Sequence, residues 1–342
     1  MAQTTTGDFP MQAAFYERTG PAAEVLQLAD LPDPQPGPGE LRVRLHWSGV
    51  NPSDVKSRAG LRNAAMAFPR VVPHSDGMGV VDAVGDGVSA ARIGQRVWLW
   101  NAAWGRPFGT AAQYVVLPQA QAVALPDNVA DEAGACLGIP ALTALHALLM
   151  AGSDGASVAG QRVLVAGGAG AVGHYAVQFA RLLGAAQVIA TTSTPEKAAL
   201  ARAAGADLTV DYRQADAAAL LREATQGQGV DRIVELDLAA NAALDLDALR
   251  PGGDLVVYGS GASPFELPFF PLIAKNLNLR FFIVYHLAPN DRARAEAALT
   301  GWLRRGLLQH NIAGRLPLAQ IAQAHDAVAQ GRLAGNLVLS IP

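Results

Sequence analysis

Two rhythms of apolar and polar positions divide the chain. From residue 12 to about residue 126, short runs rich in β-branched and aromatic residues alternate with turns of Gly, Pro and Asp. Such runs predict a compact antiparallel or barrel-like domain; they are QAAFYE, EVLQLADL, ELRVRLHWSGV, MGVVDAV, RVWLW and AAQYVVL. The segment PDPQPGPGE at 32–40 contains four prolines, which have no amide hydrogen to donate to a β-ladder, and it is predicted to be a surface loop.

After about residue 139, apolar runs alternate with helical patterns, which is typical of a parallel sheet covered on both faces. The predicted strands are 162–166, 187–192, 208–212, 231–236 and 255–259. The helix after the second strand has readable ends, with Thr194 as N-cap, Pro195 as first helical residue and Gly205 as left-handed C-cap. Beyond residue 279 come FFIVYH, helices at 292–305 and 318–330, and a last strand, NLVLSIP; local pattern does not decide their domain.

The segment 134–152 is long enough to be considered as a membrane helix, since Thr143 and His146 are its only polar side chains. Gly138, Pro140 and the lack of flanking Lys or Arg favour a buried helix of an α/β protein instead. The N-terminal stretch MAQTTTGDFP lacks the positive and apolar regions of a secretory signal. We therefore expect a cytoplasmic protein.

Composition narrows the class further. A chain of 342 residues with 51% apolar residues suits about two domains with a sizeable core and excludes a disordered protein. Lys and Arg total 26 against 29 for Asp and Glu, so no overall basic field for nucleic acid exists. Cys136 is the only cysteine, which excludes intrachain disulfides and any metal site with two or more thiolates.

The strongest chemical signal is QRVLVAGGAGAVGHYAVQFARLLG, where an apolar strand runs into Gly168, Gly170 and Gly173 and then into a helix. In this G-x-G-x-x-G spacing, Gly168 allows a tight turn, Gly170 lets the backbone approach a pyrophosphate, and Gly173 lets the helix pack closely. The positive end of the helix then faces the phosphates. The spacing alone is weak in a chain rich in Ala and Gly, but the flanking strand, helix and second strand favour dinucleotide binding.

The end of the second strand favours NADPH over NADH. NAD enzymes usually carry Asp or Glu there, to accept bonds from the adenosine ribose. This chain has four hydroxyl residues at 191–194, no acid before Glu196, and then Lys197. Hydroxyls and a lysine bind a 2′-phosphate that an acid would repel, through charge-assisted bonds of roughly 1.5–3 kcal/mol each. The alternative for Lys197 is an ordinary solvated helix lysine.

Four segments carry a resemblance to a known family: SGVNPSDVKSRAG (48–60), VPHSDGMGVVDAVGDGV (72–88), LGIPALTALHAL (137–148) and VLVAGGAGAVG (163–173). They resemble the zinc-free quinone oxidoreductases of the medium-chain dehydrogenase/reductase superfamily, and residues 230–261 look most like the zeta-crystallin type. The resemblance implies an α/β fold. A GroES-like, β-rich catalytic and substrate domain would comprise 1–138 and 280–342, and a Rossmann domain, a doubly wound parallel sheet that binds NADPH, would comprise 139–279.

The resemblance also implies that no metal is bound. Zinc alcohol dehydrogenases of the superfamily have Cys, His and Cys where this chain has Asn51, Ser75 and Ile139, and His74 beside them is a single imidazole. Without a Lewis acid nothing stabilises the alkoxide that an alcohol must form. A quinone instead takes hydride directly from the nicotinamide and a proton from solvent. The expected activity is therefore NADPH-dependent, metal-independent reduction of small quinones.

The resemblance places Asn51 and Thr143 near the nicotinamide. Lys56 stands where relatives often have a Tyr, and either holds an anionic oxygen of the acceptor or points into solvent. Asp54 pairs with Lys56 or Arg58, or caps the following turn. His46, His146 and His325 lie in apolar segments and are expected to be packed or surface histidines.

The expected cofactor-binding residues follow the nucleotide from its pyrophosphate to its carboxamide. They are Ala169, Gly170, Ala171, Val172 and Gly173 at the pyrophosphate, Ser193, Lys197 and Tyr212 at the adenosine phosphate, Val257, Tyr258, Gly259 and Ser260 at the nicotinamide ribose, Phe282, Ile283 and Val284 at the carboxamide, and, more weakly, Asn336.

Two other functions stay open. One is reduction of an activated carbon–carbon double bond in an alkenal or enone, against which Lys56 argues, because such enzymes often use the missing Tyr as proton donor. The other is an NADPH-binding protein with a structural or RNA-binding role, against which the overall acidity argues. The run FFIVYH would be an exposed edge in a monomer, and relatives pair this edge across a two-fold axis, so a homodimer is expected.

Overall fold

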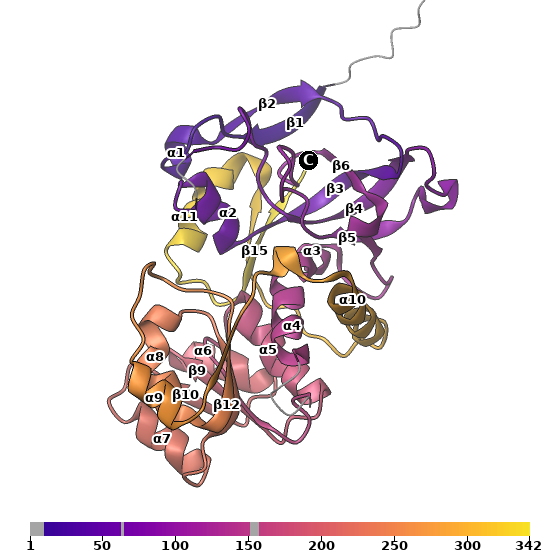
Figure 1. Ribbon diagram of the computed structural model, residues 1–342. Coiled ribbons are helices and arrows are strands. Elements are labelled where there is room, and N and C mark those ends of the chain that lie inside the picture. Colours follow the sequence, from indigo (N-terminus) through magenta and orange to yellow (C-terminus); the bar gives the residue numbers. More distant parts are fainter. Residues whose placement is uncertain (1–9, 63–64, 151–156) are drawn as a thin grey trace, which may run out of the picture. The chain divides into compact units, whose positions relative to one another are not determined.

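A computed structural model describes residues 10–62, 65–150 and 157–342 (Figure 1). The described residues form two compact units, one up to Ile139 together with Trp302–Pro342, the other from Pro140 to Gly301. The stretch considered for a secretory signal lies, apart from Pro10, outside the described residues, as do residues 151 and 152 of the apolar segment.

The first unit is mainly antiparallel, as the spacing of its apolar runs predicts. β1 (Pro10–Phe15) pairs with β2 (Gln27–Pro32). A larger sheet has the order β14 (Ile312–Pro317), β15 (Asn336–Ser340), β3 (Glu40–Val50), β4 (Asp76–Val84), β5 (Arg96–Leu99) and β7 (Ala122–Ala124), with β6 (Tyr114–Pro118) also on β3. Because β15 pairs antiparallel with β3, the C-terminal strand belongs to this unit.

Strand β3 shows why these segments form a sheet. Leu41, Val43 and Leu45 are buried in one core cluster, whereas the alternate residues Arg42 and Arg44 are more exposed. This period of two is that of a strand with one face in the core. The α-helices among the described residues of this unit include α1 (Ala22–Val25), α2 (Pro52–Arg58), α3 (Asp131–Gly134) and α11 (Ile321–Ala329).

The second unit is a six-stranded parallel sheet with the order β10, β9, β8, β11, β12, β13. This is the strand order of a dinucleotide-binding doubly wound fold. The strands are β8 (Arg162–Val165), β9 (Gln187–Thr192), β10 (Leu208–Asp211), β11 (Val230–Glu235), β12 (Leu249–Val257) and β13 (Asn278–Phe281). The helices are α4 (Leu142–Leu149), α5 (Ala171–Leu182), α6 (Pro195–Ala203), α7 (Ala217–Ala224), α8 (Leu238–Ala248), α9 (Phe269–Ala274) and α10 (Pro289–Arg304), whose last turn crosses into the first unit.

Helix α6 has the predicted ends. Thr194 Oγ1 accepts the backbone N–H of Lys197 at 3.2 Å, and Pro195 is the first helical residue. Gly205 follows the C-cap with φ +111°, a backbone conformation that a side chain would strain. Strand β12 departs from the prediction, because it begins at Leu249 rather than at 255. The register with β11 shifts: Val230 pairs with Leu249, whereas Arg232 pairs with Asp254. The segment RPGG (250–253) therefore forms an irregularity inside β12 instead of a turn before the strand.

The described part of the apolar segment does not form one regular α-helix. A π-helix at Leu137–Ala141, which contains Pro140, runs directly into α4, whose eight residues are all buried. Pro140 has no N–H to donate, which fits the wider helical turn at this point. Among the helices of residues 10–62, 65–150 and 157–342, none combines the length and apolarity that crossing a bilayer needs.

The second unit extends beyond the expected boundary at 279/280. β13 pairs in parallel with β12 and is the outermost strand, so the chain leaves the sheet only after Phe281. Of the run FFIVYH, only Phe281 is in a strand; Val284–His286 form a 3-10 turn in which Val284 and Tyr285 are buried. Continued pairing and packing therefore carry the unit to Gly301.

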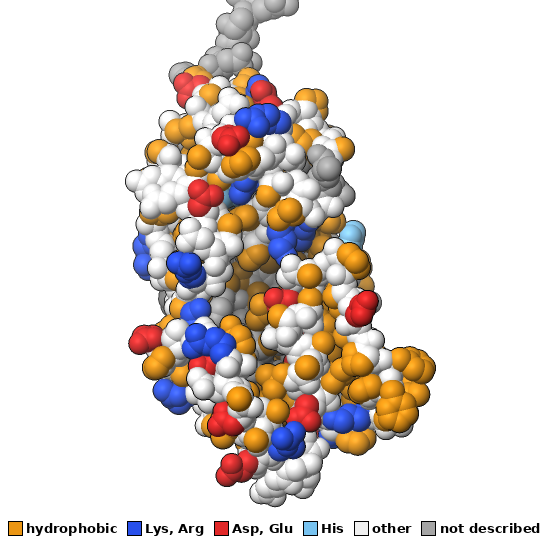
Figure 2. All heavy atoms as spheres, turned by 90° about the vertical axis from the view of Figure 1, so that its left-hand side faces the viewer, with side chains coloured by type: hydrophobic (Ala, Val, Ile, Leu, Met, Phe, Trp, Pro, Cys, Tyr) orange, Lys and Arg blue, Asp and Glu red, His pale blue; other side chains and the backbone are white. Residues whose placement is uncertain are grey.

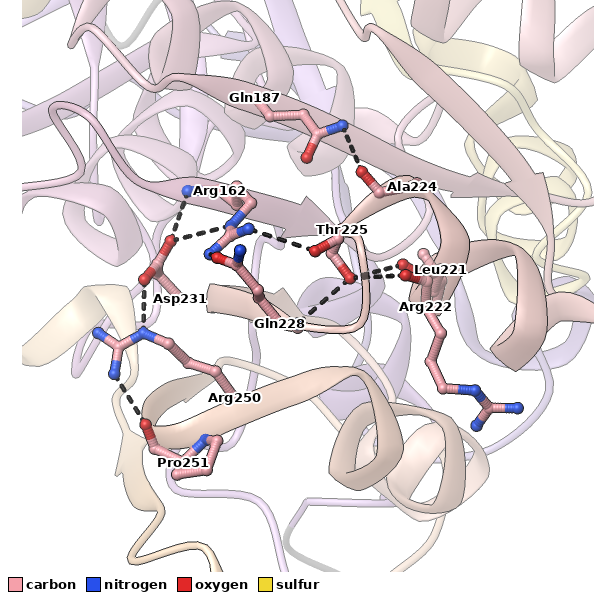
Figure 3. Close-up of polar contacts among 11 residues, drawn as sticks. Arg162, Gln187, Leu221, Arg222, Ala224, Thr225, Gln228, Asp231, Arg250 and Pro251 are labelled. Atoms are coloured by element: carbon pink, nitrogen blue, oxygen red, sulfur yellow. Dashed lines mark hydrogen bonds and ion pairs between the residues drawn. The ribbon is translucent and has the colours of Figure 1, made fainter.

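A polar network fixes the amino ends of the strands (Figure 3). Asp231, near the start of β11, accepts the backbone N–H of Arg162 at 2.7 Å and Nε of Arg250 at 2.5 Å. Arg162 also donates to Gln228 Oε1 at 2.9 Å. Asp231 thus ties β8 and the start of β12 to β11 at the edge opposite the glycine turn, which leaves the carboxyl edge for ligands.

Candidate functional site

The glycine turn follows β8 at the carboxyl edge of the parallel sheet. Gly170 N donates to Gly167 O at 2.8 Å, and Gly167 has φ +64°. Gly167 N and Gly168 N also donate to Thr191, to Oγ1 at 3.1 Å and to O at 3.0 Å respectively, which joins the turn to the end of β9. The glycine with the left-handed conformation is therefore Gly167, which comes before the three glycines of the motif. Gly168 lacks a side chain for another reason: a Cβ there would lie 2.5 Å from the methyl group of Ala190.

Gly173 and Gly170 serve different purposes. A Cβ on Gly173 would lie 2.1 Å from Gly167 O, so this glycine lets α5 pack against the turn. A Cβ on Gly170, the N-cap of α5, would meet only Gly167 O at 3.2 Å. The backbone at Gly170 is thus open on one side, and the amides of the first turn of α5, from Ala171 to Gly173, have no partners within the helix. Such a helix start favours an anion.

The residues expected at the adenosine phosphate follow two neighbouring strands. Asp211 of β10 is opposite Thr192 of β9 in the parallel register, so Ser193 and Tyr212 emerge at the same edge. Tyr212 is 45% exposed, and Ser193 and Lys197 are half-buried.

Of the four hydroxyl residues at 191–194, only some can reach an adenosine phosphate. Thr191 bonds the glycine turn, Thr194 caps α6, and Thr192 is buried, which leaves Ser193. Asp211 forms two hydrogen bonds with Arg213, at 3.0 and 2.8 Å. Arg213 is thus a further cation at this edge that was not predicted, although its position directly after Tyr212 was a signal for it.

An aromatic cluster stands at the carboxyl end of β12. Phe282 N donates to Val257 O at 3.2 Å, and the Phe282 ring lies 4.8 Å from the imidazole of His146, edge-on. The ring of Tyr258 is 6.4 Å from that of Phe282. His146 lies on α4 one turn after Thr143, and burial lowers its pKa, so it is a packed neutral histidine as expected. Thr143, Tyr258 and Phe282 therefore belong to one region of the second unit.

The other residues expected to bind the cofactor differ in their surroundings and in their burial. Gly259 has no room for a side chain, since a Cβ would lie 2.3 Å from Leu236 O. Ser260 Oγ donates to Ala262 O at 2.8 Å. Ala169, Gly173, Val257 and Val284 are buried, whereas Gly170, Ala171, Val172 and Ile283 are half-buried.

Two buried carboxyl groups, Glu235 and Asp245, interact with each other, and Glu235 lies near Tyr258; no motif in the sequence indicates either. Tyr258 N donates to the backbone oxygen of Glu235 at 3.1 Å, and Glu235 Oε1 accepts from Asn241 Nδ2 at 2.9 Å. Burial, with the charge of Glu235, raises the pKa of Asp245 to about 9. The pair therefore carries a proton at neutral pH, which avoids two adjacent buried charges.

In the first unit, Asn51 begins helix α2. Asp54 Oδ2 accepts the backbone N–H of Asn51 at 2.8 Å, and the two residues form a capping box. Asp54 thus stabilises the start of its own helix, α2, rather than capping a turn that follows it. Burial raises the pKa of Asp54 to about 7. Lys56, on the same helix, is half-buried.

The three segments that contain Asn51, Ser75 and Ile139 meet in the first unit. Asp76, next to Ser75, accepts at Oδ2 from Asn51 Nδ2 and from Ile139 N, both at 2.9 Å. Burial raises the pKa of Asp76 well above its usual range. Neither Asn51, Ser75 nor Ile139 offers a thiolate or an imidazole, and within the described ranges no three His, Cys, Asp or Glu side chains gather as metal ligands would.

The histidines near these segments are bound to other groups. His74 Nε2 is 2.9 Å from His325 Nε2, and His74 Nδ1 is 2.8 Å from Ser48 Oγ. Both rings are fully buried, and burial lowers the pKa of each. His46 is half-buried beside Asp131, with Nδ1 at 3.1 Å from Oδ2. His325 is thus a packed histidine, as expected.

The expected residues are divided between the two units. Asn51, Lys56 and Asn336 belong to the first unit, and Asn336 Nδ2 donates there to Asn311 O at 3.2 Å. All the others belong to the second unit. Their assignment to a cofactor or a substrate stays a prediction.

The chain is similar to known proteins both in sequence and in structure. Two family models match the chain, "Alcohol dehydrogenase GroES-like domain" at residues 37–127 and "Zinc-binding dehydrogenase" at residues 171–300. A human protein named quinone oxidoreductase is 30% identical over 337 residues, covering 98% of this chain and 99% of its own length. A quinone oxidoreductase of Pseudomonas aeruginosa is 32% identical over 320 residues, covering 92% and 95%. A mycobacterial protein solved with NADPH is similar in structure, with a TM-score of 0.84, 31% identity and coverage of 96% and 99%.

Proposed function

This chain belongs to the quinone oxidoreductases of the medium-chain dehydrogenase/reductase superfamily, and on that premise we propose that it reduces small quinones with NADPH and without a metal. The observation that carries the proposal is the glycine turn of the second unit, with its open backbone at Gly170 and the free amides at the start of α5. We assign nucleotide binding to this unit and quinone binding to the first.

The fit of NADPH to this chain rests on two features. Gly170 leaves room for a pyrophosphate to approach the backbone, and the amides of α5 can donate to it. At the adenosine end, Ser193, Lys197 and Tyr212 can bind a 2′-phosphate, while Asp211 is held by Arg213. When bound, NADPH supplies the hydride. No free acid of β9 or its loop repels the extra phosphate.

The protein's own contribution is orientation and exclusion of water. Tyr258, Phe282 and Val284 would form an apolar wall for the nicotinamide, and Thr143 and Ser260 would offer hydroxyls beside it. Asn51 and Lys56 would hold the oxygens of the quinone. Because conjugation spreads the developing charge over the quinone oxygens, no metal is needed to stabilise an alkoxide, and the proton comes from solvent.

Zinc does not fit the residues that stand at the ligand positions of zinc-dependent relatives. Asn51 Nδ2 donates to Asp76, Ile139 supplies only a backbone amide there, and Ser75 is a hydroxyl. The proposed reaction therefore includes no step at zinc.

The decisive experiment is NADPH oxidation with a panel of quinones, enones and alcohols in the presence of a chelator, repeated with NADH. Quinone turnover that resists chelation and prefers NADPH supports the proposal. Alcohol oxidation that chelation abolishes overturns it, and preference for enones identifies a double-bond reductase. NADPH binding without turnover of any acceptor points to a structural role, and a shift assay with RNA at low salt tests the nucleic-acid alternative.

We also propose a homodimer formed through the edge strand of the second unit. Phe281 at the end of β13 is 57% exposed, and Phe269 and Phe270 of the neighbouring helix α9 are each 73% exposed. Figure 2 shows hydrophobic side chains gathered at the lower right of the face that it draws. An unpaired edge with exposed aromatic residues is a liability in a monomer. Light scattering at micromolar concentration should give the dimer mass and, for Phe270→Lys, a shift toward monomer; a monomeric wild type contradicts the proposal.

A cytoplasmic location is the accompanying proposal. Its support is that the sequence has a single cysteine, Cys136, which is buried, so no intrachain disulfide is possible. Cell fractionation tests it, and recovery of the protein outside the cytoplasm contradicts it.

A further inference from the structure

Asp76 occupies a position in the first unit where three segments distant in sequence converge. It is the first residue of β4 and is fully buried. Its Oδ2 accepts from the side-chain amide of Asn51, which follows β3, and from the backbone N–H of Ile139, which lies in the turn before α4. One oxygen atom therefore joins the start of α2 to the turn at 137–141.

The surroundings prevent this carboxyl group from moving. A Cβ on Gly138 would lie 2.2 Å from Asp76 Oδ1, so only a glycine there leaves room for the carboxyl group. Gly49, which is opposite Asp76 in the β3–β4 register, would place a Cβ 3.1 Å from Asp76 Cβ. The two glycines therefore leave the room that the side chain of Asp76 occupies, and a larger residue at either position would displace it.

The backbone of Asp76 is fixed as well. Thr110 Oγ1 donates to Asp76 O at 2.5 Å, and Thr110 Oγ1 lies 2.8 Å from Ser48 Oγ. Ser48 in turn contacts His74 Nδ1 at 2.8 Å. A connected buried network of this kind is rigid because every member constrains its neighbours.

The contact with Asp76 determines the orientation of Asn51. A carboxylate oxygen accepts from an N–H, so the nitrogen of the Asn51 amide faces Asp76. In the capping box, the side chain of Asn51 accepts the backbone N–H of Asp54, and Asp54 accepts the backbone N–H of Asn51. The second N–H of the Asn51 amide is then left, in one orientation, to donate to an oxygen of the acceptor.

We propose that Asp76 is a positioning residue for quinone reduction, which holds Asn51 and the turn at Ile139 in the geometry that the acceptor requires. This inference rests on the proposed function, in which Asn51 binds the acceptor. Asp76 itself touches neither substrate nor cofactor. Misplacing a substrate-binding group by about 1 Å can cost on the order of 100-fold in rate.

Three variants test the proposal by steady-state kinetics. Asp76→Ala removes the shared acceptor and should lower kcat for quinone by about 10- to 100-fold, while the Kd for NADPH stays within about twofold of wild type. Asp76→Asn keeps one oxygen for both N–H groups and should restore most of kcat. The matched control is Asp82→Ala, on the same strand, where the lost contact is with Arg42 and not with Asn51. Wild-type kcat in Asp76→Ala, or an equal loss in Asp82→Ala, overturns the proposal.

A second measurement does not depend on activity or on the folding of a variant. In the wild-type protein, the side-chain amide of Asn51 and the backbone amide of Ile139 should exchange slowly with solvent in nitrogen-15 NMR spectra. Fast exchange of both overturns the proposal. Slow exchange in a protein that reduces no acceptor shows that the contacts exist and that the proposed function, not the contact geometry, is wrong.

Discussion

Replacing Gly170 by alanine separates ligand binding from folding at the glycine turn. The added methyl group would stand where a pyrophosphate must approach the backbone. Displacing a phosphate from even one charge-assisted hydrogen bond costs roughly 1.5–3 kcal/mol. Since about 1.4 kcal/mol corresponds to tenfold in affinity, we expect Gly170→Ala to raise the Kd for NADPH by about 10- to 100-fold.

The same substitution should leave stability almost unchanged. Gly170 has φ −74° and ψ 175°, which alanine adopts freely, and its Cβ would meet only Gly167 O at 3.2 Å. Alanine is the poorer N-cap by up to about 1 kcal/mol. It also restricts the unfolded chain, which stabilises the fold by about 0.4–1 kcal/mol. The two effects offset each other, so the free energy of unfolding should change by less than about 1 kcal/mol.

Gly173→Ala is the matched control, with the opposite expectation. Its Cβ would lie 2.1 Å from Gly167 O and 3.0 Å from the Cα of Gly168, both backbone atoms that cannot rotate away. Helix α5 would have to move, and overpacking of this kind costs about 1–3 kcal/mol. Stability should therefore fall before any ligand is added.

The assays are calorimetric titration with NADPH and urea unfolding followed by circular dichroism. If Gly170→Ala binds NADPH as tightly as the wild type, the pyrophosphate does not approach the backbone at Gly170. If Gly170→Ala instead loses as much stability as Gly173→Ala, the two glycines serve the same purpose.

Three further predictions concern charge and burial. Lys197→Asp should shift preference toward NADH in the ratio of kcat/KM values, and an unchanged ratio discards the role assigned to Lys197. Arg232 is fully buried, donates to Leu148 O at 3.1 Å and Met150 O at 2.7 Å at the end of α4, and lies 3.3 Å from Asp254 Oδ2. In Arg232→Met these two carbonyl groups lose a buried donor, while Arg280 still pairs with Asp254 at 3.1 Å. The free energy of unfolding in urea should therefore fall by about 1–3 kcal/mol, and an unchanged value contradicts this. Burial lowers the pKa of His325 from its usual 6.5 to about 3. Between these two pH values this histidine is protonated in the unfolded chain and neutral in the folded protein, so the free energy of unfolding falls as the pH falls. This histidine contributes up to about 1.4 kcal/mol per pH unit, and His325→Gln should flatten the slope; an equal slope in both proteins argues against it.

Local patterns predicted much of the fold. The cap at Thr194 and Pro195 is an interaction between residues close in sequence, so the sequence predicted it. Apolar periodicity predicted the strands for a similar reason, because burial of one face depends on spacing alone. The segment RPGG was misread, since its place in β12 depends on pairing with β11, which local pattern does not encode.

Local sequence patterns could not predict the contacts between residues that are far apart along the chain. The spacing of glycines predicted a dinucleotide turn, but it did not show that Gly167 adopts the left-handed conformation or that Gly168 must leave room for Ala190. Asp76 reaches Asn51 and Ile139 over separations of 25 and 63 residues, and nothing near Asp76 in the sequence indicates either contact.

The sequence by itself determined two secondary-structure rhythms, a nucleotide turn and the absence of paired cysteines, because each depends on residue identity and short spacing. The tertiary structure decided which buried polar groups meet. A buried donor or acceptor must find a partner wherever the fold brings one within reach, and that choice is made by the packing of whole elements rather than by neighbours along the chain.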